Sequence, residues 1–331
     1  MRPLLALRQL LVSLAWTTLA LGAIAAVALT PAARNILAEA LSHVTIKVVL
    51  ATIPGQAISC LLCGGALFLL RPGVSLGTAI VARSLRDAGA NLLVFLPGLG
   101  EIIGARALVL AGCQAVPAVS ASALDNLAET AAQVPFALVA FAMLPRIWDD
   151  AGGLPREVTR GLLTLALPLV GLSASLAIAA ASLPAIRRRY SALFARSRAA
   201  VTRALHHVRD QRRGFPGALL LHALAWAMGG VQLWMAARAL ALPLGICQAI
   251  VIESVVYTMR GFAFFVPAGL AVQEWAIVLA GALYGLKPEQ SLTLGLTLRL
   301  RDVVFGVVLL LWPVMELACA RRTHLRGVLA E

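Results

Sequence analysis

The sequence contains few charged residues and almost no lysine. Only 13% of its 331 residues are charged, and lysine occurs only at Lys47 and Lys287. The five cysteines lie in apolar segments and form no Cys/His group with the spacing of a metal site. A nucleophile with a nearby base and a glycine-rich phosphate loop are also missing. We therefore expect no metal, no cofactor and no soluble enzyme domain.

Apolar residues are abundant instead. They make up 60% of the chain, and its mean hydropathy is +0.89, above the roughly half-apolar composition of soluble domains. The composition predicts an all-α, polytopic integral membrane protein. The net charge of +13 could indicate nucleic-acid binding in a soluble chain, but here the arginines gather beside apolar runs, which is typical of orientation in a membrane. No nucleic-acid partner is expected.

About six segments are apolar enough to be read as full spans. The Pro54-Gly55 pair predicts a break inside the second of these, and a loop of mixed charge from Arg146 to Glu157 should follow the third. A lone His222 inside the fifth is expected to be a hydrogen-bonded packing residue rather than a ligand. The first predicted span ends near Leu29. The other five are Ala40–Leu70, Leu124–Leu144, Val158–Pro184, Pro216–Leu242 and Ser291–Ala320.

A basic segment separates two halves of what we expect to be one domain, residues 1–331. Residues 187–213 hold nine arginines against the single acid Asp210, with apolar residues at helical spacing. This pattern predicts an amphipathic helix on the cytoplasmic membrane surface. The tail, residues 321–331, is also basic. Both termini should then lie on the cytoplasmic side.

Two segments, Val74–Val116 and Ile246–Gly285, are apolar but interrupted by proline, glycine and charge. Each is predicted to form a helical hairpin, re-entrant or broken, and the count of crossings gives the two hairpins opposite orientations. The segments also share a short pattern, FLPGLGE from Phe95 and FVPAGLAVQE from Phe265, each ahead of an arm ending in VLAG. Chance could produce so short a match. An inverted repeat of broken helices is nevertheless the sequence sign of a binding site within the membrane.

Charges inside these segments need partners or a wet cavity. Glu253 and Arg260 are seven residues apart, and Arg299 and Asp302 three apart, so each pair shares a helical face. We expect Glu274 to meet Arg299 or Arg301. Glu101 should meet Arg106 or a cation from the second half. The other interpretation is that these are buried ion pairs that only fix packing.

The same residues carry a resemblance to a known family. The chain resembles the transmembrane region of lysylphosphatidylglycerol synthases, a flippase-like family, and within it the hopanoid-biosynthesis-associated, HpnL-type branch. The resemblance covers about Leu11 to Ala320. Two departures from the family pattern are Arg106, which follows its glutamate by five residues rather than four, and Ala268, which replaces a glycine. The matching residues are Asn91, Pro97, Gly98, Gly100, Glu101 and Arg106 in the first half, and Pro267, Gly269, Glu274, Gly285 and Arg299 in the second.

This resemblance implies a bacterial inner-membrane protein that moves or positions lipids. The synthases join the region to a soluble aminoacyl-transfer domain, whereas only eleven residues follow Ala320, so we expect no aminoacyl-lipid synthesis here. We predict a lipid flippase or transport factor for hopanoids or other polar-headed lipids, with membrane lipids and hopanoid-biosynthesis enzymes as partners. The alternatives are an intramembrane lipid-modifying enzyme, with Glu101 and Glu274 as acid and base, and a non-catalytic scaffold.

Overall fold

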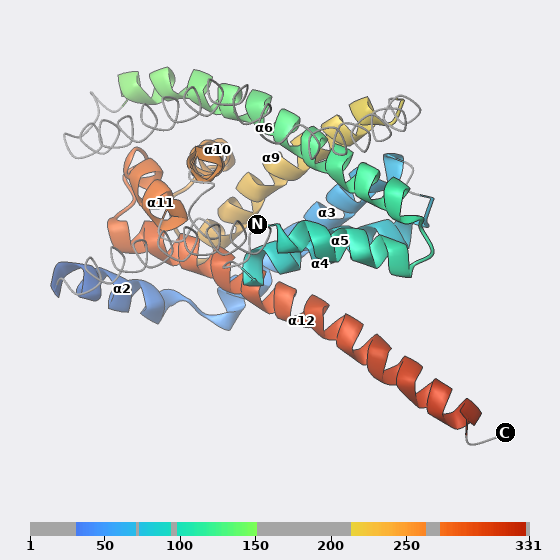
Figure 1. Ribbon diagram of the computed structural model, residues 1–331. Helices are drawn as coiled ribbons and strands as arrows, with labels where there is room; N and C mark the ends of the chain where they lie inside the picture. Colours follow the sequence, from blue (N-terminus) through green and yellow to red (C-terminus); the bar gives the residue numbers. More distant parts are fainter. Residues whose placement is uncertain (1–30, 71–72, 94–97, 151–212, 263–271, 329–331) are drawn as a thin grey trace, which may run out of the picture.

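The structure is a computed structural model that describes residues 31–70, 73–93, 98–150, 213–262 and 272–328. In these ranges it is entirely α-helical, as predicted, without a β-strand. Figure 1 shows the helices as one bundle from which the last helix extends. The helices are α2 (Pro31–His43), α3 (Ile46–Leu69), α4 (Leu76–Leu92), α5 (Leu99–Leu110), α6 (Ala115–Asp150), α9 (Phe215–Ala239), α10 (Ile246–Phe262), α11 (Val272–Ala282) and α12 (Pro288–Val328).

Helices α3 and α9 pack against each other at the centre of the bundle. They are 24 and 25 residues long, and among the described helices these two are long and apolar enough to cross a membrane. At 1.5 Å per residue each is about 36 Å long, slightly more than the ~30 Å hydrocarbon layer. Gly55 lets them approach, because a Cβ there would lie 2.6 Å from Cγ of Gln232.

The series of helices that begins with α3 is repeated in the series that begins with α9. Helices α3 to α6 have 24, 17, 12 and 36 residues, and α9 to α12 have 25, 17, 11 and 41. Each half also repeats one close contact. A Cβ on Gly64 would lie 2.4 Å from Cα of Ile80, and one on Gly230 would lie 2.6 Å from Cα of Ile250. The structure therefore contains a repeated arrangement, while the inverted membrane orientation of the repeats stays a prediction.

Both interrupted segments form pairs of packed helices, α4 with α5 and α10 with α11. In the first pair the chain turns at Gly98, whose φ of +83° is readily adopted only by glycine. Gly100 then packs directly on α4, since a Cβ there would be 2.6 Å from the Arg86 carbonyl oxygen. The break predicted at Gly98 is thus present. The adjoining residues 94–97, and the second turn at 263–271, lie outside the described residues.

Several predicted boundaries were wrong. Pro54 lies inside the continuous helix α3, whereas the interruption falls earlier, between α2 and α3. Helix α6 continues through Arg146 to Asp150, where a loop was expected, and α12 continues to Val328, so the basic tail begins as helix. Proline in a helix removes one hydrogen bond, and packing against neighbouring helices can compensate for that loss. The predicted segments at 1–29, 158–184 and 187–212 lie outside the described residues.

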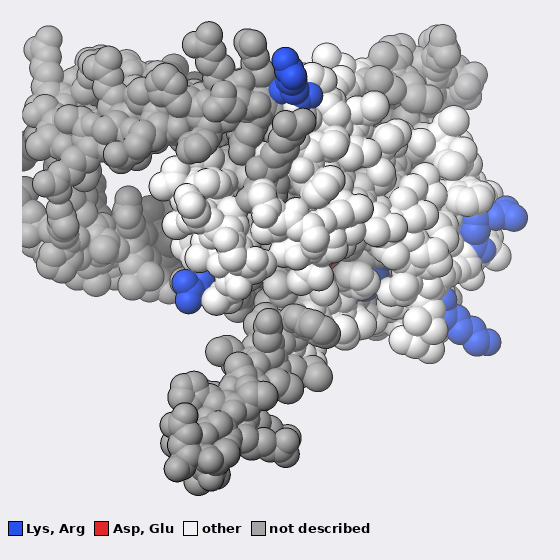
Figure 2. All heavy atoms as spheres, turned by 90° about the vertical axis from the view of Figure 1, so that its right-hand side faces the viewer, with Lys and Arg blue, Asp and Glu red and all other residues white. Residues whose placement is uncertain are grey.

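Many large apolar side chains are exposed on the described part of the protein. Figure 2 shows a mostly uncharged face with hardly any acidic side chain and with lysine or arginine mainly near its margins. On α12 the exposed large side chains recur at helical spacing, at Leu300, Val303, Val304, Val307, Val308 and Leu311. Such an apolar outer stripe suits contact with lipid chains.

Candidate functional site

Arg83, on α4, is the centre of the largest ion-paired group among the described residues. Its side chain is 1% exposed. Its Nε lies 2.9 Å from Oδ2 of Asp125, and its Nη2 lies 2.7 Å from Oε1 of Glu129. Asp87, one turn along α4, accepts a hydrogen bond from Nη1. A guanidinium removed from water requires such partners, because an uncompensated buried charge is strongly destabilising. Arg83 therefore joins α4 to α6.

Arg86 brings a third helix into the group. Its Nη1 donates to Oε2 of Glu129 at 2.9 Å, and its Nη2 donates to Oδ1 of Asn126. The same Nη2 lies 3.5 Å from Oε1 of Glu101, the third residue of α5. Helices α4, α5 and α6 are thus held together through one side chain.

His222 extends the group to α9. Its Nε2 lies 2.8 Å from Oδ1 of Asp125, and both side chains are 1% exposed. One turn further on, Trp226 donates its indole N–H to the backbone carbonyl of Glu129 at 3.1 Å. The hydrogen-bonded role predicted for His222 is confirmed. We name as the first charged cluster Arg83, Arg86, Asp87, Asp125, Glu129 and His222.

A second polar group lies between α3, α9 and α12. Gln232, 3% exposed, donates to Oγ of Ser59 at 2.8 Å and accepts a hydrogen bond from Nη1 of Arg301. Arg301, 5% exposed, also donates through Nη2 to Oδ1 of Asp302 at 2.7 Å. We name these four residues the second polar cluster. Its arginine is satisfied by an amide and by the neighbouring carboxylate.

Glu274 and Arg299 form a separate pair between α11 and α12. Arg299 contacts Oε1 through Nε and reaches Oε2 through Nη2 at 3.3 Å, a two-pronged geometry that is favourable for a guanidinium and a carboxylate. Glu274 is the third residue of α11, the position that Glu101 holds in α5. The two hairpins therefore carry equivalent glutamates just after their turns.

A small cavity lies between α3, α4 and α12. Asp87 of the first cluster and Asp302 of the second both line it, together with further polar side chains. Its volume is about 20 Å³, enough for about one water molecule, and its polar walls could hold one. The other polar lining residues are Gln56, Ser84 and Asn91.

The equivalent place in the second half, where α6, α9 and α10 meet, is filled by aromatic rings. Trp226 meets Tyr257 edge to face with centroids 4.3 Å apart, and it stacks on Phe136 at 6.5 Å. Gln133 closes the contact by donating to the backbone carbonyl of Tyr257 at 2.9 Å. The polar cavity is therefore a feature in which the two halves differ.

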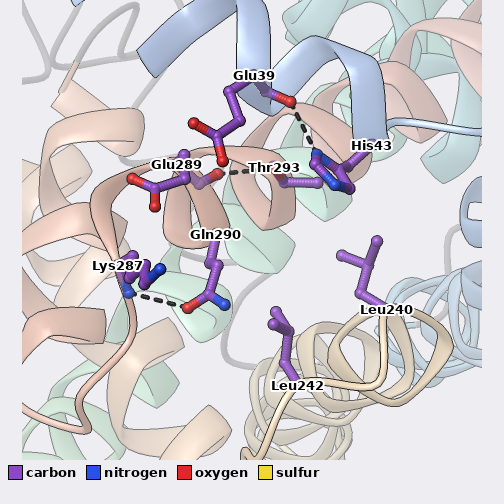
Figure 3. Close-up of a pocket in the computed structure, with 8 residues that line it drawn as sticks. All are labelled: Glu39, His43, Leu240, Leu242, Lys287, Glu289, Gln290 and Thr293. Atoms are coloured by element: carbon purple, nitrogen blue, oxygen red, sulfur yellow. Dashed lines mark hydrogen bonds between the residues drawn. The ribbon is translucent and has the colours of Figure 1, made fainter. Parts of the chain in front are cut away.

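A larger cavity of about 180 Å³ lies elsewhere, where α2, the chain after α9 and the start of α12 come together (Figure 3). Leu240 and Leu242 form its apolar wall, opposite Glu39 and Lys287. Both of these charged side chains are exposed to solvent, so they need no protein partner. This cavity shares no lining residue with the clusters, and it is not included in the candidate site.

Comparison with protein families gives one match, in which the model of the lysylphosphatidylglycerol synthase TM region covers residues 19–309. The chain belongs to this family. No curated protein and no solved structure matches it. Family membership together with the apolar helices α3 and α9 indicates a membrane location and a function related to membrane lipids. Both clusters and the cavity between them lie inside the matched region.

Some of the predicted charge partners are correct and others are wrong. The contact predicted between Glu274 and Arg299 is present. Glu101 meets Arg86, a cation of the first half, whereas Arg106 is exposed on α5. The expected facing pair of Arg299 and Asp302 is replaced by two others, because the rotation of α12 directs Arg299 to α11 and leaves Asp302 beside Arg301.

The remaining predicted site residues are dispersed. Asn91 lines the cavity, Arg301 and Asp302 belong to the second polar cluster, and Glu253 is buried on α10. Arg260 lies over the ring of Tyr257, 5.7 Å from its centroid, rather than on a carboxylate. Gly285 ends the turn after α11 with a φ of +73°. Outside the described residues lie Pro97, Pro267 and Gly269.

Sequence reasoning missed most of the first charged cluster. Asp125 and Glu129 were absent from the predicted site, although they are four residues apart on one face of the same helix. Arg83, Arg86 and Asp87 show the same signal on α4. The site was predicted at the turns because proline, glycine and charged residues occur together there. Most members of the first charged cluster instead lie within continuous helices.

Proposed function

We propose that this protein moves polar-headed lipids across the membrane. The observation that carries the proposal is the cavity lined by Asp87 and Asp302, one aspartate from each cluster, in a bundle that exposes many large apolar side chains. Ionisable residues within a membrane protein are costly and mark pathways for polar groups. The family's relation to membrane lipids makes a lipid headgroup the natural polar group for this path.

The outer surface of α12 supports an arrangement for the rest of the lipid. Phe305 and Gly306 line the cavity, while Val304 and Val308 beside them are 42% and 63% exposed. A headgroup between α4 and α12 would therefore leave its acyl or ring portion against an apolar helix face. This division between a polar interior and an apolar exterior is what transport of an amphiphile requires.

The proposed transport requires the helices around the cavity to separate. A cavity of about 20 Å³ cannot hold a headgroup, so α4 and α12 must separate for a lipid to pass. They meet closely at Gly306, where an added Cβ would lie 3.6 Å from Cα of Ala88. This contact offers a place to lock the protein shut.

The experiment uses the pair Ala88→Cys and Gly306→Cys in a full-length background whose native cysteines are replaced by serine. A disulfide needs Cα atoms about 4.4–6.8 Å apart, and a Cβ at residue 306, one bond from its own Cα, would lie 3.6 Å from Cα of Ala88. Purified protein is reconstituted into liposomes with a fluorescent phospholipid, and its movement between leaflets is measured with a membrane-impermeant quencher. We expect oxidation to stop the movement and reductant to restore it.

The two single-cysteine variants are the controls, and oxidation should leave them active. Lipid movement that continues in the oxidised double variant, with the disulfide verified by mass spectrometry, would contradict passage between α4 and α12. The absence of protein-dependent movement in any sample, for phospholipids and for hopanoids alike, would contradict the proposed function.

The finer parts of the proposal concern lipid and location. We expect hopanoids or other polar-headed lipids as cargo, the bacterial inner membrane as the location, cytoplasmic termini, and proximity to hopanoid-biosynthesis enzymes. We also expect transport rather than catalysis. Lipid analysis of a deletion strain separates these: normal lipid species with altered distribution between membranes or leaflets support transport, whereas a missing species would support a lipid-modifying enzyme.

A further inference from the structure

Glu253, on α10, is a buried carboxyl group that the clusters described above do not include. Its side chain is 5% exposed, and its Oε2 has no hydrogen-bond partner among the described residues. Its side chain lies against α9 at Gly229, where an added Cβ would be 3.3 Å from Cγ and 3.4 Å from Oε1 of Glu253. The absence of a side chain at Gly229 thus makes room for the carboxyl group.

The surroundings of Glu253 on α10 are mostly apolar. Ile252 and Val256, its neighbours along the helix, are 0% and 2% exposed and belong to the core formed with α9, α11 and α12. Burying an ionised carboxylate with one oxygen unpaired is expensive, and the protonated form avoids much of that cost. Apolar packing alone therefore favours a bound proton.

Two cations near Glu253 act in the opposite direction. Arg301 on α12 and Arg260 on α10 both attract its negative charge. Each already has another partner, because Arg301 bonds Gln232 and Asp302, and Arg260 lies over Tyr257. Any shift of α12 that moves Arg301 toward or away from α10 would change the balance between the ionised and protonated forms.

The other groups around α10 are neutral or already paired. Tyr257 is a hydrogen-bonding neighbour on α10 itself, and Asp302 adds a negative charge from α12. Helix α9 contributes Gln232, which is bonded to Ser59 and Arg301, and His222, which is bonded to Asp125. Elsewhere, α6 presents neutral Gln133 together with Asp125 and Glu129, which are held by arginines of α4, and α11 carries Glu274, paired with Arg299.

We propose that Glu253 is a reversible proton-binding site, and that binding of the proton is coupled to the movement of α12 that lets lipid pass. The step adds one proton from the aqueous phase to the carboxylate and forms a neutral carboxylic acid, without any redox change. The coupling rests on the proposed lipid transport, whereas proton binding at Glu253 does not.

Proton binding is tested by chemical labelling of the full-length protein in liposomes. Dicyclohexylcarbodiimide reacts with protonated carboxyls in apolar surroundings and leaves an acylurea adduct that mass spectrometry locates. We expect an adduct at Glu253 that decreases as pH rises, by up to about tenfold per pH unit because the ratio of protonated to ionised carboxyl changes by that factor. Glu274, held by Arg299, is the internal comparison and should stay unlabelled.

Infrared difference spectra between acidic and alkaline pH provide a second readout that does not depend on reagent access. The carbonyl band of a protonated carboxyl should appear in the wild type, persist in Glu289→Gln, and be lost in Glu253→Gln. Labelling that does not vary with pH, or a carbonyl band that Glu253→Gln retains, would overturn the proton site.

Coupling is tested with the fluorescent-phospholipid assay under an imposed pH gradient. We expect the direction of the gradient to change the initial rate of lipid movement several-fold in the wild type and to have no effect in Glu253→Gln, while Glu253→Asp retains the response. Lipid movement that ignores the gradient in the wild type would overturn the coupling and leave the proposed function intact. Conversely, pH-dependent labelling without any lipid movement would overturn the proposed function and the coupling but keep the proton site.

Discussion

The two helical hairpins hold similar backbones but obtain their charge partners differently. In the first, α4 carries its own cations, Arg83 and Arg86, which bind carboxylates of α4, α5 and α6. In the second, α10 carries the acid Glu253, and the glutamate of α11 takes its cation, Arg299, from α12. The first hairpin thus supplies the cations of its own ion pairs, whereas Glu274 of the second hairpin takes its cation from α12.

This difference separates a fixed part of the molecule from a part that can change. Helix α12 contacts α4 and α11, and it also carries Arg301 beside the buried Glu253. Movement of α12 would leave the first charged cluster whole, because none of its members lies on α12. The same movement would change the partners of the second hairpin. We therefore expect substitutions in the first cluster to affect folding most and those along α12 to affect transport most.

The largest effect on stability is expected for Arg83→Gln. It removes the cation that binds Asp87, Asp125 and Glu129, and breaking such buried pairs costs about 3–5 kcal/mol. Thermal unfolding of the purified protein in detergent measures the loss. Arg301→Gln is the matched change in the second half, and it should cost less because Arg301 has one carboxylate partner, Asp302, whereas Arg83 has three, including the 1% exposed Asp125. Equal losses would contradict the contrast between a fixed and a mobile half.

Substitution of the paired glycines should affect the two halves alike. Gly64→Ala and Gly230→Ala both direct a methyl group into the backbone of the next helix, and overpacking of this kind costs about 1–3 kcal/mol. Gly65→Ala is the control, because its nearest neighbour is the flexible end of Leu221 at 3.3 Å, and it should be neutral or slightly stabilising. Unequal losses of stability at Gly64 and Gly230 would show that the two repeated contacts do not contribute equally to stability.

The pair of Glu274 and Arg299 tests whether the second hairpin works through α12. Glu274→Gln and Arg299→Gln should each reduce lipid movement while expression stays intact, and their effects should be non-additive by about 0.5–3 kcal/mol, as for residues in direct contact. The measurement is a double-mutant cycle on the rate of lipid movement in liposomes. Wild-type transport in both well-expressed single variants would remove this pair from the site.

The smallest effect is expected for Arg106→Gln. Arg106 is exposed on α5, and surface changes of this kind usually stay within about 0.5 kcal/mol. Arg86→Gln, on the same hairpin, is the comparison and should be markedly destabilised because it loses Glu129, Asn126 and Glu101 together. The same unfolding assay measures both. A large loss of stability for Arg106→Gln would contradict the exposed position of this side chain.

The all-helical class, the hairpin at Gly98 and the contact of Glu274 with Arg299 could be predicted, because apolar length, helix-breaking residues and opposite charges are visible locally. The ion-pair partners of the other charged residues could not be predicted. Whether Arg299 faces Asp302 or Glu274 depends on the rotation of α12 against α11, and sequence spacing does not determine that rotation. The break predicted at Pro54 was wrong for a related reason. Neighbouring helices stabilise α3 at a proline that would interrupt an isolated helix.

The length of helix α12 has a further consequence. Its 41 residues form one continuous helix, about 60 Å long at 1.5 Å per residue and twice the ~30 Å thickness of the hydrocarbon layer. Figure 1 shows its last turns extending away from the bundle. A displacement of the far end of one continuous helix would also shift the segment that holds Arg299, Arg301 and Asp302, and with it the contacts of α12 with α4 and α11.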